Sequence, residues 1–372
     1  MNVPQFTPWI GKSEYREIAE CFQTTWITEG PKSAAFKDEL LKLSGARYGV
    51  LAPNGTLALF LGLKALGIGH GDEVLVPDFS FIASATAVEM CGGIPVFVDV
   101  NRENFQINLL SAKRLIGKKT KAIMPVHIYG TVCAMDEVMN FAKLYGLLVI
   151  EDAAQALNVR YKQQHAGTFG NVGCFSFFAD KTITTGEGGF VVTAQEKIYN
   201  KLLYLRNQGR LTSGTFKHPH LGYNLRLTDI QAAIGLAQLK KLGRITSRKL
   251  RILNLYQKLL SDISQITMFI PPKDAEWLPF RIPIIAQHAH ILMEFMRNHG
   301  VEPRTFFYPL HRQPAFRYLR TKNTLRLSDK DFSGAVFGYK HGICLPTFPT
   351  LTYQQIKYVV KIIRNFYQTF NG

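Results

Sequence analysis

The segment "YGVLAPNGTLALFLGLKAL", Tyr48 to Leu66, joins an apolar strand pattern to an apolar helix pattern through a short turn of small residues. The alternation repeats in "DEVLVP" and "IASATAVEMC", then in "KAIMPVHIYG" and "AMDEVMNFAKLYG", and closes with "LLVIEDA". Strands rich in Val and Ile and nearly continuous in apolar character, each followed by a helix, are typical of a parallel sheet covered by helices on both faces. The sequence therefore predicts an α/β domain between residues 47 and 193.

The rest of the chain predicts a second, smaller unit. Apolar residues recur at helical spacing from Leu225 to about Leu260, which predicts one long helix there. Two further helix patterns follow after proline-rich breaks, at 289–300 and 353–370. We therefore predict three parts: an N-terminal segment 1–30, a large α/β domain 31–250 and a smaller α+β C-terminal domain 251–372.

The composition is that of a soluble globular protein, because 47% of the 372 residues are hydrophobic and only 19% are charged. The five cysteines are scattered, without the paired spacing of a zinc site or a disulfide framework, so we expect a reducing cytoplasm and no metal. The N-terminus has no basic segment followed by an apolar core, and no apolar run reaches the roughly 18 residues of a membrane span. We expect no membrane insertion.

The formal net charge of +17 raises the possibility of an anionic partner. The positive residues are dispersed except in "LKKLGRITSRKLR", residues 239–251, part of a predicted helix. Such a helix is either a solvated face or a source of positive potential that attracts nucleotide diphosphates and contacts their pyrophosphate. Because no nucleic-acid-binding motif is present, we expect no nucleic-acid partner, and salt-sensitive DNA or RNA binding through this helix stays a remote alternative.

A lone lysine follows an apolar strand pattern in "FSFFADKTITTGEGG", Phe175 to Gly189. Lys181 has no acidic residue four positions away, so no helical ion pair accounts for it. Partial burial at a strand end lowers the pKa of a lysine and makes its amine a nucleophile toward carbonyls. The alternative is a lysine that extends its charged end into solvent.

Other polar and aromatic side chains also follow predicted strands, where ligands of open α/β sheets collect. Asn54-Gly55-Thr56 opens a helix and can bind a phosphate, or it is a simple cap. Phe81 can stack on a planar cofactor or pack in the core. Asp152 can pair with a protonated pyridine nitrogen, with Gln155 near a ring oxygen, or it caps a helix.

These features occur in one chain order, each at a strand end: an anion site, a stacking ring, an acid, Ser176 and the lysine. Pyridoxal 5′-phosphate needs an amine for its Schiff base, a carboxylate for its pyridinium and donors for its phosphate. The residues together therefore predict a pyridoxal-phosphate site.

Over nearly its whole length the chain resembles the DegT/DnrJ/EryC1/StrS family of nucleotide-sugar aminotransferases. The resemblance implies a fold-type-I, aspartate-aminotransferase-like α/β enzyme, and it rests on these stretches: "TTWITEGP", "LAPNGTLALFLGLKALGIGHGDEVLVP", "KAIMPVHIYG", "VIEDAAQA", "GTFGNVGCFSFFADKTITTGEGG", "LGYNLRLTDIQAAIGLAQL" and "FFYPLHRQPAF".

The resemblance also implies residue roles. Lys181 forms the Schiff base with the cofactor, Asp152 pairs with its pyridinium, Gln155 lies near its ring hydroxyl and Phe81 stacks on its ring. The implied phosphate ligands are Gly55, Thr56, Ser176 and, from the neighbouring subunit of a homodimer with shared active sites, Asn224. The implied substrate-side residues are Trp26, Tyr308 and His311.

The implied reaction moves an amino group from L-glutamate to a nucleotide-linked keto sugar. The form "KTITTGEGG" resembles enzymes that act on 4-keto-6-deoxy sugars, which give 4-amino-4,6-dideoxy sugars for polysaccharides such as the O-antigen of lipopolysaccharide. A GDP-linked sugar is favoured, and a 3-keto UDP- or dTDP-linked sugar is the alternative. The dehydratase branch of the family has histidine in place of the lysine, so Lys181 argues against it.

Three positions depart from the family pattern. Asp180 stands before the lysine where relatives often carry Asn, Ser80 replaces a common threonine, and Thr305 stands where proline is usual. Asp180 points away from the lysine if the segment is extended, and it can tune the pKa of Lys181 if the chain turns. These changes leave the cofactor prediction intact and bear on the substrate.

Overall fold

The computed structural model describes residues 1–210, 216–319 and 327–370. Within these residues the largest sheet has seven strands in the order β1-β9-β8-β5-β4-β2-β3. Their bounds are Tyr48–Ala52 (β1), Glu73–Pro77 (β2), Ile94–Val98 (β3), Thr120–Ile123 (β4), Leu148–Asp152 (β5), Val172–Ser176 (β8) and Gly189–Thr193 (β9). Six of these strands run in one direction and β9 runs against them. The predicted α/β architecture with a mainly parallel sheet is confirmed.

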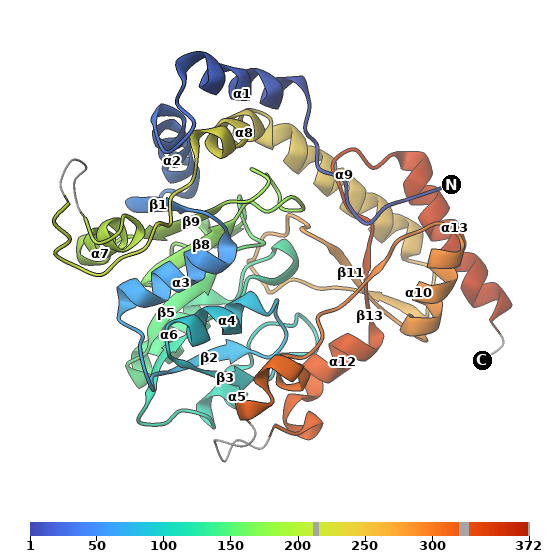
Figure 1. Cartoon of the computed structure of the whole chain (residues 1–372). Coiled ribbons are helices and arrows are strands. Elements are labelled where there is room, and N and C mark those ends of the chain that lie inside the picture. Colours follow the sequence, from blue (N-terminus) through green and yellow to red (C-terminus); the bar gives the residue numbers. More distant parts are fainter. Residues whose placement is uncertain (211–215, 320–326, 371–372) are drawn as a thin grey trace.

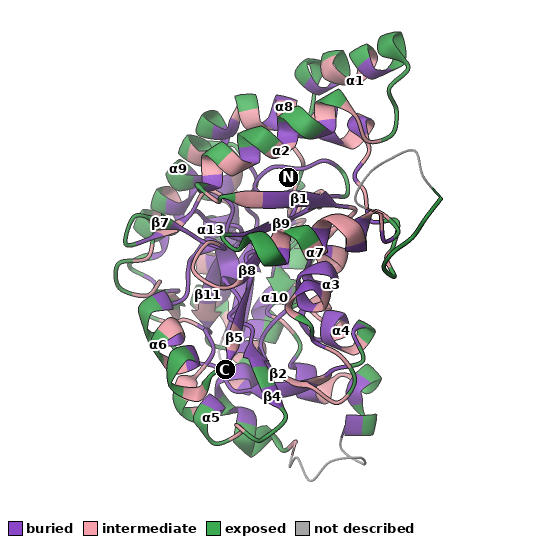
Figure 2. Cartoon of the chain, turned by 90° about the vertical axis from the view of Figure 1, so that its left-hand side faces the viewer, coloured by how far each residue is buried: buried purple, intermediate pink, exposed green. Residues whose placement is uncertain are grey.

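Helices cover both faces of this sheet (Figure 1). One face is packed against α3, α4 and α7, and the other against α2 and α6. Their bounds are Pro31–Ser44 (α2), Gly55–Leu66 (α3), Ala83–Met90 (α4), Met135–Tyr145 (α6) and Glu196–Arg206 (α7), with the short α5 at Leu109–Lys113. In Figure 2 the strands are almost entirely buried, while the outer helices alternate between buried and exposed residues. This two-sided covering explains why the strands are continuously apolar in the sequence.

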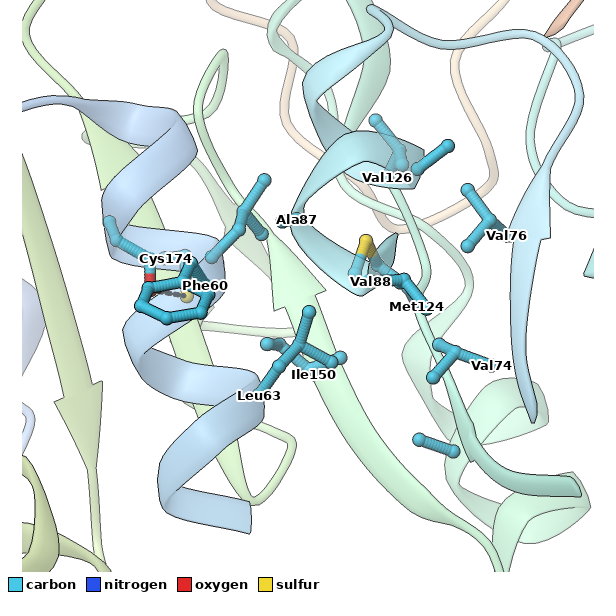
Figure 3. Close-up of a cluster of buried hydrophobic side chains, with 14 of the residues drawn as sticks. Phe60, Leu63, Val74, Val76, Ala87, Val88, Met124, Val126, Ile150 and Cys174 are labelled. Carbon is cyan, nitrogen blue, oxygen red and sulfur yellow. Dashed lines mark hydrogen bonds between the residues drawn. The ribbon is translucent and has the colours of Figure 1, made fainter. Parts of the chain in front are cut away.

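Successive strand residues face opposite cores. Val74 and Val76 of β2 lie with Phe60 and Leu63 of α3 in the cluster of Figure 3, whereas Leu75 belongs to the cluster on the other face. Because side chains alternate across a sheet, each strand contributes to both cores. The carboxyl ends of the parallel strands are thereby fixed in register at one edge.

The C-terminal part is built on a four-stranded antiparallel sheet in the order β10-β11-β13-β12. Its strands are Ile266–Met268 (β10), Ile282–Ala286 (β11), Arg304–Thr305 (β12) and Gly342–Leu345 (β13), and the neighbouring helices are Ala289–Asn298 (α10), Ser333–His341 (α12) and Tyr353–Thr369 (α13). Its core includes Val3 from the chain start, which bridges to Val301. The boundary at residue 250 falls inside a helix and stays a prediction.

The prediction of one long helix from Leu225 to Leu260 is wrong in two respects. The helix starts only at Asp229, because Thr228 caps it through a reciprocal bond pair with Gln231, and it is divided at Lys241 into α8 (Asp229–Lys240) and α9 (Leu242–Leu260). The two halves have different partners, since α8 packs on α1 (Lys12–Thr24) and α2 whereas α9 packs on α13. Figure 1 shows α8 above the large sheet and α9 running toward the C-terminal sheet.

The basic residues of 239–251 mainly contact the N-terminal segment. Lys240 pairs with Glu17 at 2.5 Å and Lys241 with Glu14 at 2.6 Å. Three cations of this stretch, those of Lys241, Arg244 and Arg248, lie within 5.2 Å of the ring centre of Trp9. Much of this positive charge therefore fixes the first residues of the chain onto α8 and α9.

The remaining sequence features can be placed briefly. All five cysteines are buried and free. Across residues 1–210, 216–319 and 327–370, none of the helices combines the length and the apolar character needed to cross a membrane.

Candidate active site

A cavity of about 410 Å³ lies between the carboxyl edge of the large sheet and the C-terminal sheet. Residues from β11 and β12, or just before them, complete its wall: Phe280, Arg281, Arg304 and Thr305. The structure brings seven of the sequence-predicted site residues together around it: Gly55, Thr56, Phe81, Asp152, Gln155, Ser176 and Lys181. One ligand in this cavity can therefore meet all of them.

The N-terminus of α3 forms one end of the cavity. Asn54 caps the helix by accepting the N–H of Leu57 at 2.9 Å, so the predicted capping role is real. The N–H groups of Gly55 and Thr56 have no hydrogen-bond partner within the described residues, and the positive end of the helix dipole lies here. Ser176 lies beside them, since a Cβ on Gly55 would stand only 2.8 Å from the Cβ of Ser176. This end fits a phosphate group.

Asp152 lies at the end of β5, and its carboxylate is oriented by two residues of the α4 region. Ser84 donates to its Oδ2 at 2.7 Å, and the hydroxyl of Ser80 lies 2.7 Å from that of Ser84. The N–H of Ala154 donates to Oδ1 at 3.1 Å. The carboxylate is thus buried and fixed in orientation, as a partner for a protonated ring nitrogen must be.

The neighbouring Glu151 points to the opposite side of the strand. It accepts three backbone N–H bonds, from Gly167, Phe169 and Gly170, at 2.6 to 2.7 Å. It also bonds to Nε2 of His127 at 2.9 Å. Glu151 therefore anchors the loop before β8, and the alternation of the strand leaves Asp152 for the cavity.

Lys181 follows β8 on a turn and is half-buried in the cavity wall. Its Nζ lies 4.3 Å from the ring centre of Phe280. Burial lowers the pKa of Lys181, and the positive charge of Arg281 lowers it further, against the opposing effects of Asp180 and Asp152. The lowered pKa expected from the sequence is confirmed, so a larger fraction of the amine is unprotonated and nucleophilic near neutral pH.

Gln155 and Phe81 flank the same space. The Oε1 of Gln155 accepts the N–H of Tyr129 at 2.8 Å, which leaves the NH₂ end of the amide for a ligand. Phe81 is 59% exposed although it lines the cavity, so its ring is accessible for stacking. The residues present thus fit pyridoxal phosphate at its phosphate, its ring nitrogen and its carbonyl.

Four sequence-predicted residues do not line this cavity in the described chain. Asn224 is exposed and accepts a hydrogen bond from Arg226, and Trp26 and Tyr308 are both partly exposed. His311 is buried, and its ring nitrogens contact Asp78 and Asp329. The roles of these four residues stay predictions, and that of Asn224 concerns a neighbouring subunit.

Sequence reasoning missed several residues that line or support the cavity. Ser84, which supports Asp152, was detectable, because it lies one helical turn after Ser80, a position that departs from the family pattern. Phe280 and Arg281 carry no local signal, since they precede an ordinary apolar strand pattern more than 90 residues after Lys181. They reach the cavity only because the second sheet packs against the first.

This arrangement fits a pyridoxal-phosphate-dependent enzyme. Residues 8–364 match the DegT/DnrJ/EryC1/StrS aminotransferase family, and the chain belongs to that family, which defines its class: a pyridoxal-phosphate-dependent sugar aminotransferase.

Several relatives cover almost the entire chain. The GDP-perosamine synthase of Escherichia coli O157:H7 is 37% identical over 370 residues, which is 98% of each chain. That of Vibrio cholerae is 35% identical over 374 residues, covering 98% of this chain and 99% of the relative. Among solved structures, S. venezuelae DesV in complex with a ketimine intermediate is 28% identical with a TM-score of 0.89, covering 96% of this chain and 95% of its own.

Proposed function

We propose that this enzyme transfers the amino group of L-glutamate to C4 of a GDP-linked 4-keto-6-deoxy sugar, giving a 4-amino-4,6-dideoxy sugar of the perosamine type. The observation that carries the reaction class is the meeting of Lys181, Asp152 and the free N-terminus of α3 around one cavity. The choice of sugar is supported by the GDP-perosamine synthases, which match at 35–37% identity over at least 95% of the chain. We further propose that the product serves cytoplasmic O-antigen assembly.

When bound, pyridoxal phosphate supplies an electrophilic carbonyl and a ring that accepts the electrons of a substrate carbanion. Gly55 and Thr56 donate their backbone N–H groups, and Ser176 its hydroxyl, to the phosphate. The carboxylate of Asp152 accepts the N–H of the ring nitrogen, and the Ser80–Ser84 pair keeps it in place. Phe81 stacks on one ring face, and the NH₂ of Gln155 donates to the ring hydroxyl.

Lys181 is the group that moves protons in this proposal. Its lowered pKa makes the free amine available as a base, which would take a proton from the α-carbon of glutamate and deliver it to the carbon of the cofactor's carbonyl group. The ring of Phe280 beneath Nζ limits where the amine can move. In the second half of the reaction the same amine returns a proton to the former keto carbon of the sugar.

Arg304 gives the cavity wall an accessible cation suited to an anionic nucleotide sugar, whereas the charge of Arg281 is paired with Asp180. Arg304 lines the cavity with a side chain that is 51% exposed, and Arg281 lies deeper. An exposed cation at a cavity wall attracts diphosphate-bearing substrates. We assign the capture of the substrate pyrophosphate to this wall rather than to the basic stretch 239–251, none of whose residues is among those that line the cavity in the described chain.

The test is a product analysis with defined substrates. The purified protein is incubated with pyridoxal phosphate, L-glutamate and either a GDP-linked 4-keto-6-deoxy sugar or a 3-keto UDP- or dTDP-linked sugar, and the products are identified by mass and NMR. We expect an amine at C4 of the GDP sugar and none with K181A. An amine at C3 of a UDP- or dTDP-linked sugar would establish the alternative, and borohydride labelling of a residue other than Lys181 would refute the assignment of the amine.

We also propose a homodimer in which Asn224 reaches the phosphate site of the neighbouring subunit. The amide of Asn224 is exposed and lies outside its own cavity. If sites are shared in this way, K181A and N224A are each inactive, but subunits mixed after mild dissociation regain activity, because one site of each mixed dimer is intact. Lack of any recovery in dimers shown by mass to be mixed would contradict shared sites.

A further inference from the structure

The residue before the reactive lysine forms a buried ion pair that connects the two sheets. Asp180 pairs with Arg281, and the side chains are only 8% and 6% exposed. Arg304 lies 4.0 Å from the same carboxylate oxygen, with a half-exposed side chain. Burying two charges is costly unless their geometry and hydrogen bonds compensate. The pair lies in the cavity wall, and Asp180 is next to Lys181 in the sequence. We therefore ask what the pair does to Lys181 besides packing the two sheets together.

Phe280 connects the pair to the lysine. The Nζ of Lys181 and the guanidinium carbon of Arg281 lie 4.3 and 4.7 Å from the centre of the Phe280 ring. Phe280 is itself fixed, since its N–H donates to the carbonyl of Tyr129 at 3.1 Å. Arg281 and Lys181 thus both lie against one buried ring, and Asp180 offsets the charge of the arginine.

A third cation supports this segment from behind. Lys249 of α9 is 2% exposed and donates to the carbonyl of Pro279 at 2.9 Å. Burial lowers the pKa of Lys249 to about 7, and Arg281 adds to that effect. Several charged and titratable groups surround Lys181. They are Asp152 from β5, Asp180 beside it, Arg281 before β11, Arg304 from β12, the cavity residues Tyr129, Glu187 and Cys344 and, behind the segment, Lys249.

We propose that Asp180 and Arg281 form a positioning pair that sets the protonation and placement of Lys181 through their balanced charges and the shared Phe280 ring. The inference rests on the proposed role of Lys181 as the reacting amine. Neither residue needs to touch a reacting atom, because each acts on the amine through space. The departure from Asn to Asp at position 180 is thereby coupled to an arginine 101 positions later.

Because the charges of Asp180 and Arg281 oppose each other, removing either one is expected to shift the pKa of Lys181 in the opposite direction from removing the other. Removing the carboxylate in D180N leaves Arg281 unopposed, which disfavours the protonated amine, whereas removing the cation in R281Q leaves Asp180 to favour it. Each change is expected to move the pKa of Lys181 by about one pH unit, downward for D180N and upward for R281Q. In R281Q the nearby Arg304 reduces the rise, and the double variant returns toward the wild-type value.

The measurement is made on the full-length chain. Before the cofactor is added, trace acetylation of Lys181 is followed across pH by peptide mass spectrometry, which reports the free amine directly. After the cofactor is added, the visible absorbance of the holoenzyme is titrated, and kcat and KM are measured separately. The control is D262N, which breaks the exposed pair between Asp262 and Arg364 and is expected to move none of these values.

The conservative R281K variant separates the effect of losing the charge from the effect of misfolding. It keeps the positive charge, so the acetylation profile of Lys181 is expected to stay near wild type even if the melting temperature falls. The inference is overturned if D180N and R281Q shift the profile in the same direction, or if neither shifts it while borohydride still labels Lys181. Labelling of a different residue would instead remove the proposed function, and this inference with it.

Discussion

Gly55→Ala tests the phosphate end of the cavity with the smallest possible change. Gly55 is the first residue of α3, where alanine is compatible with the backbone, so the perturbation is the methyl group itself. That methyl would stand 2.8 Å from the Cβ and 3.0 Å from the Oγ of Ser176. The shorter distance is about 0.6 Å below the 3.4 Å at which ordinary contact begins. The helix end and Ser176 must move apart by that amount.

A shift of this size lengthens a 2.9 Å hydrogen bond to about 3.5 Å, where it is largely lost. Hydrogen bonds to charged groups contribute about 1.5–3 kcal/mol, so the dissociation constant for pyridoxal phosphate should rise roughly 10- to 150-fold. The assay is a fluorescence titration of the full-length apoprotein with the cofactor, together with the melting temperature without it.

The matched control is Gly243→Ala in α9. A Cβ at Gly243 meets nothing within 4 Å, and alanine favours a helix over glycine, so cofactor affinity should be unchanged and stability equal or higher. If G55A binds the cofactor as tightly as the wild type while remaining folded, the close contact between α3 and Ser176 does not place the phosphate donors, and the reasoning fails.

Three further outcomes are expected. D152N should lower kcat/KM by about 100-fold or more, with a normal circular dichroism spectrum, because an amide cannot stabilise a protonated ring nitrogen. G130A should lower the free energy of unfolding by about 3 kcal/mol in denaturant melts, because Gly130 has φ +86° and a Cβ would stand 2.0 Å from the carbonyl oxygen of Leu278. Burial alone would lower the pKa of His311, but its two carboxylate partners outweigh burial and raise it. That contribution to stability is complete below the ordinary pKa of 6.5 and is lost as the pH rises through the raised pKa, so H311N should flatten the decline of the unfolding free energy as the pH rises above 6.5.

The site could be predicted from the sequence to the extent that it is built from strand ends. Gly55, Asp152 and Lys181 each follow a predicted strand or begin the helix after it, and a parallel sheet aligns such positions at one edge. The chemistry of the residue types then pointed to the cofactor. The antiparallel β9 was not expected, because the turn through Lys181 carries no periodic pattern that would reveal a reversal of direction.

The helical spacing of apolar residues also failed to predict a helix end at a point where the packing partners of the chain change. The apolar spacing continues across Lys241, yet the chain breaks there because α8 and α9 pack against different elements. His311 likewise belongs to a familiar sequence motif, but its two carboxylate partners lie 233 residues before it and 18 after it. No local sequence pattern predicts which residues surround such a side chain.

The sequence by itself determined the large sheet, the order of the strand-end groups and the place of Lys181 after a strand, because these depend on residues that are near one another in the chain. Only the tertiary structure decided that Phe280 and Arg281 form the floor beside Lys181 and that Asp180 finds its partner 101 residues away. The physical reason is that the charge environment of an amine depends on distance in space, and that distance is set by the packing of two sheets rather than by spacing along the chain.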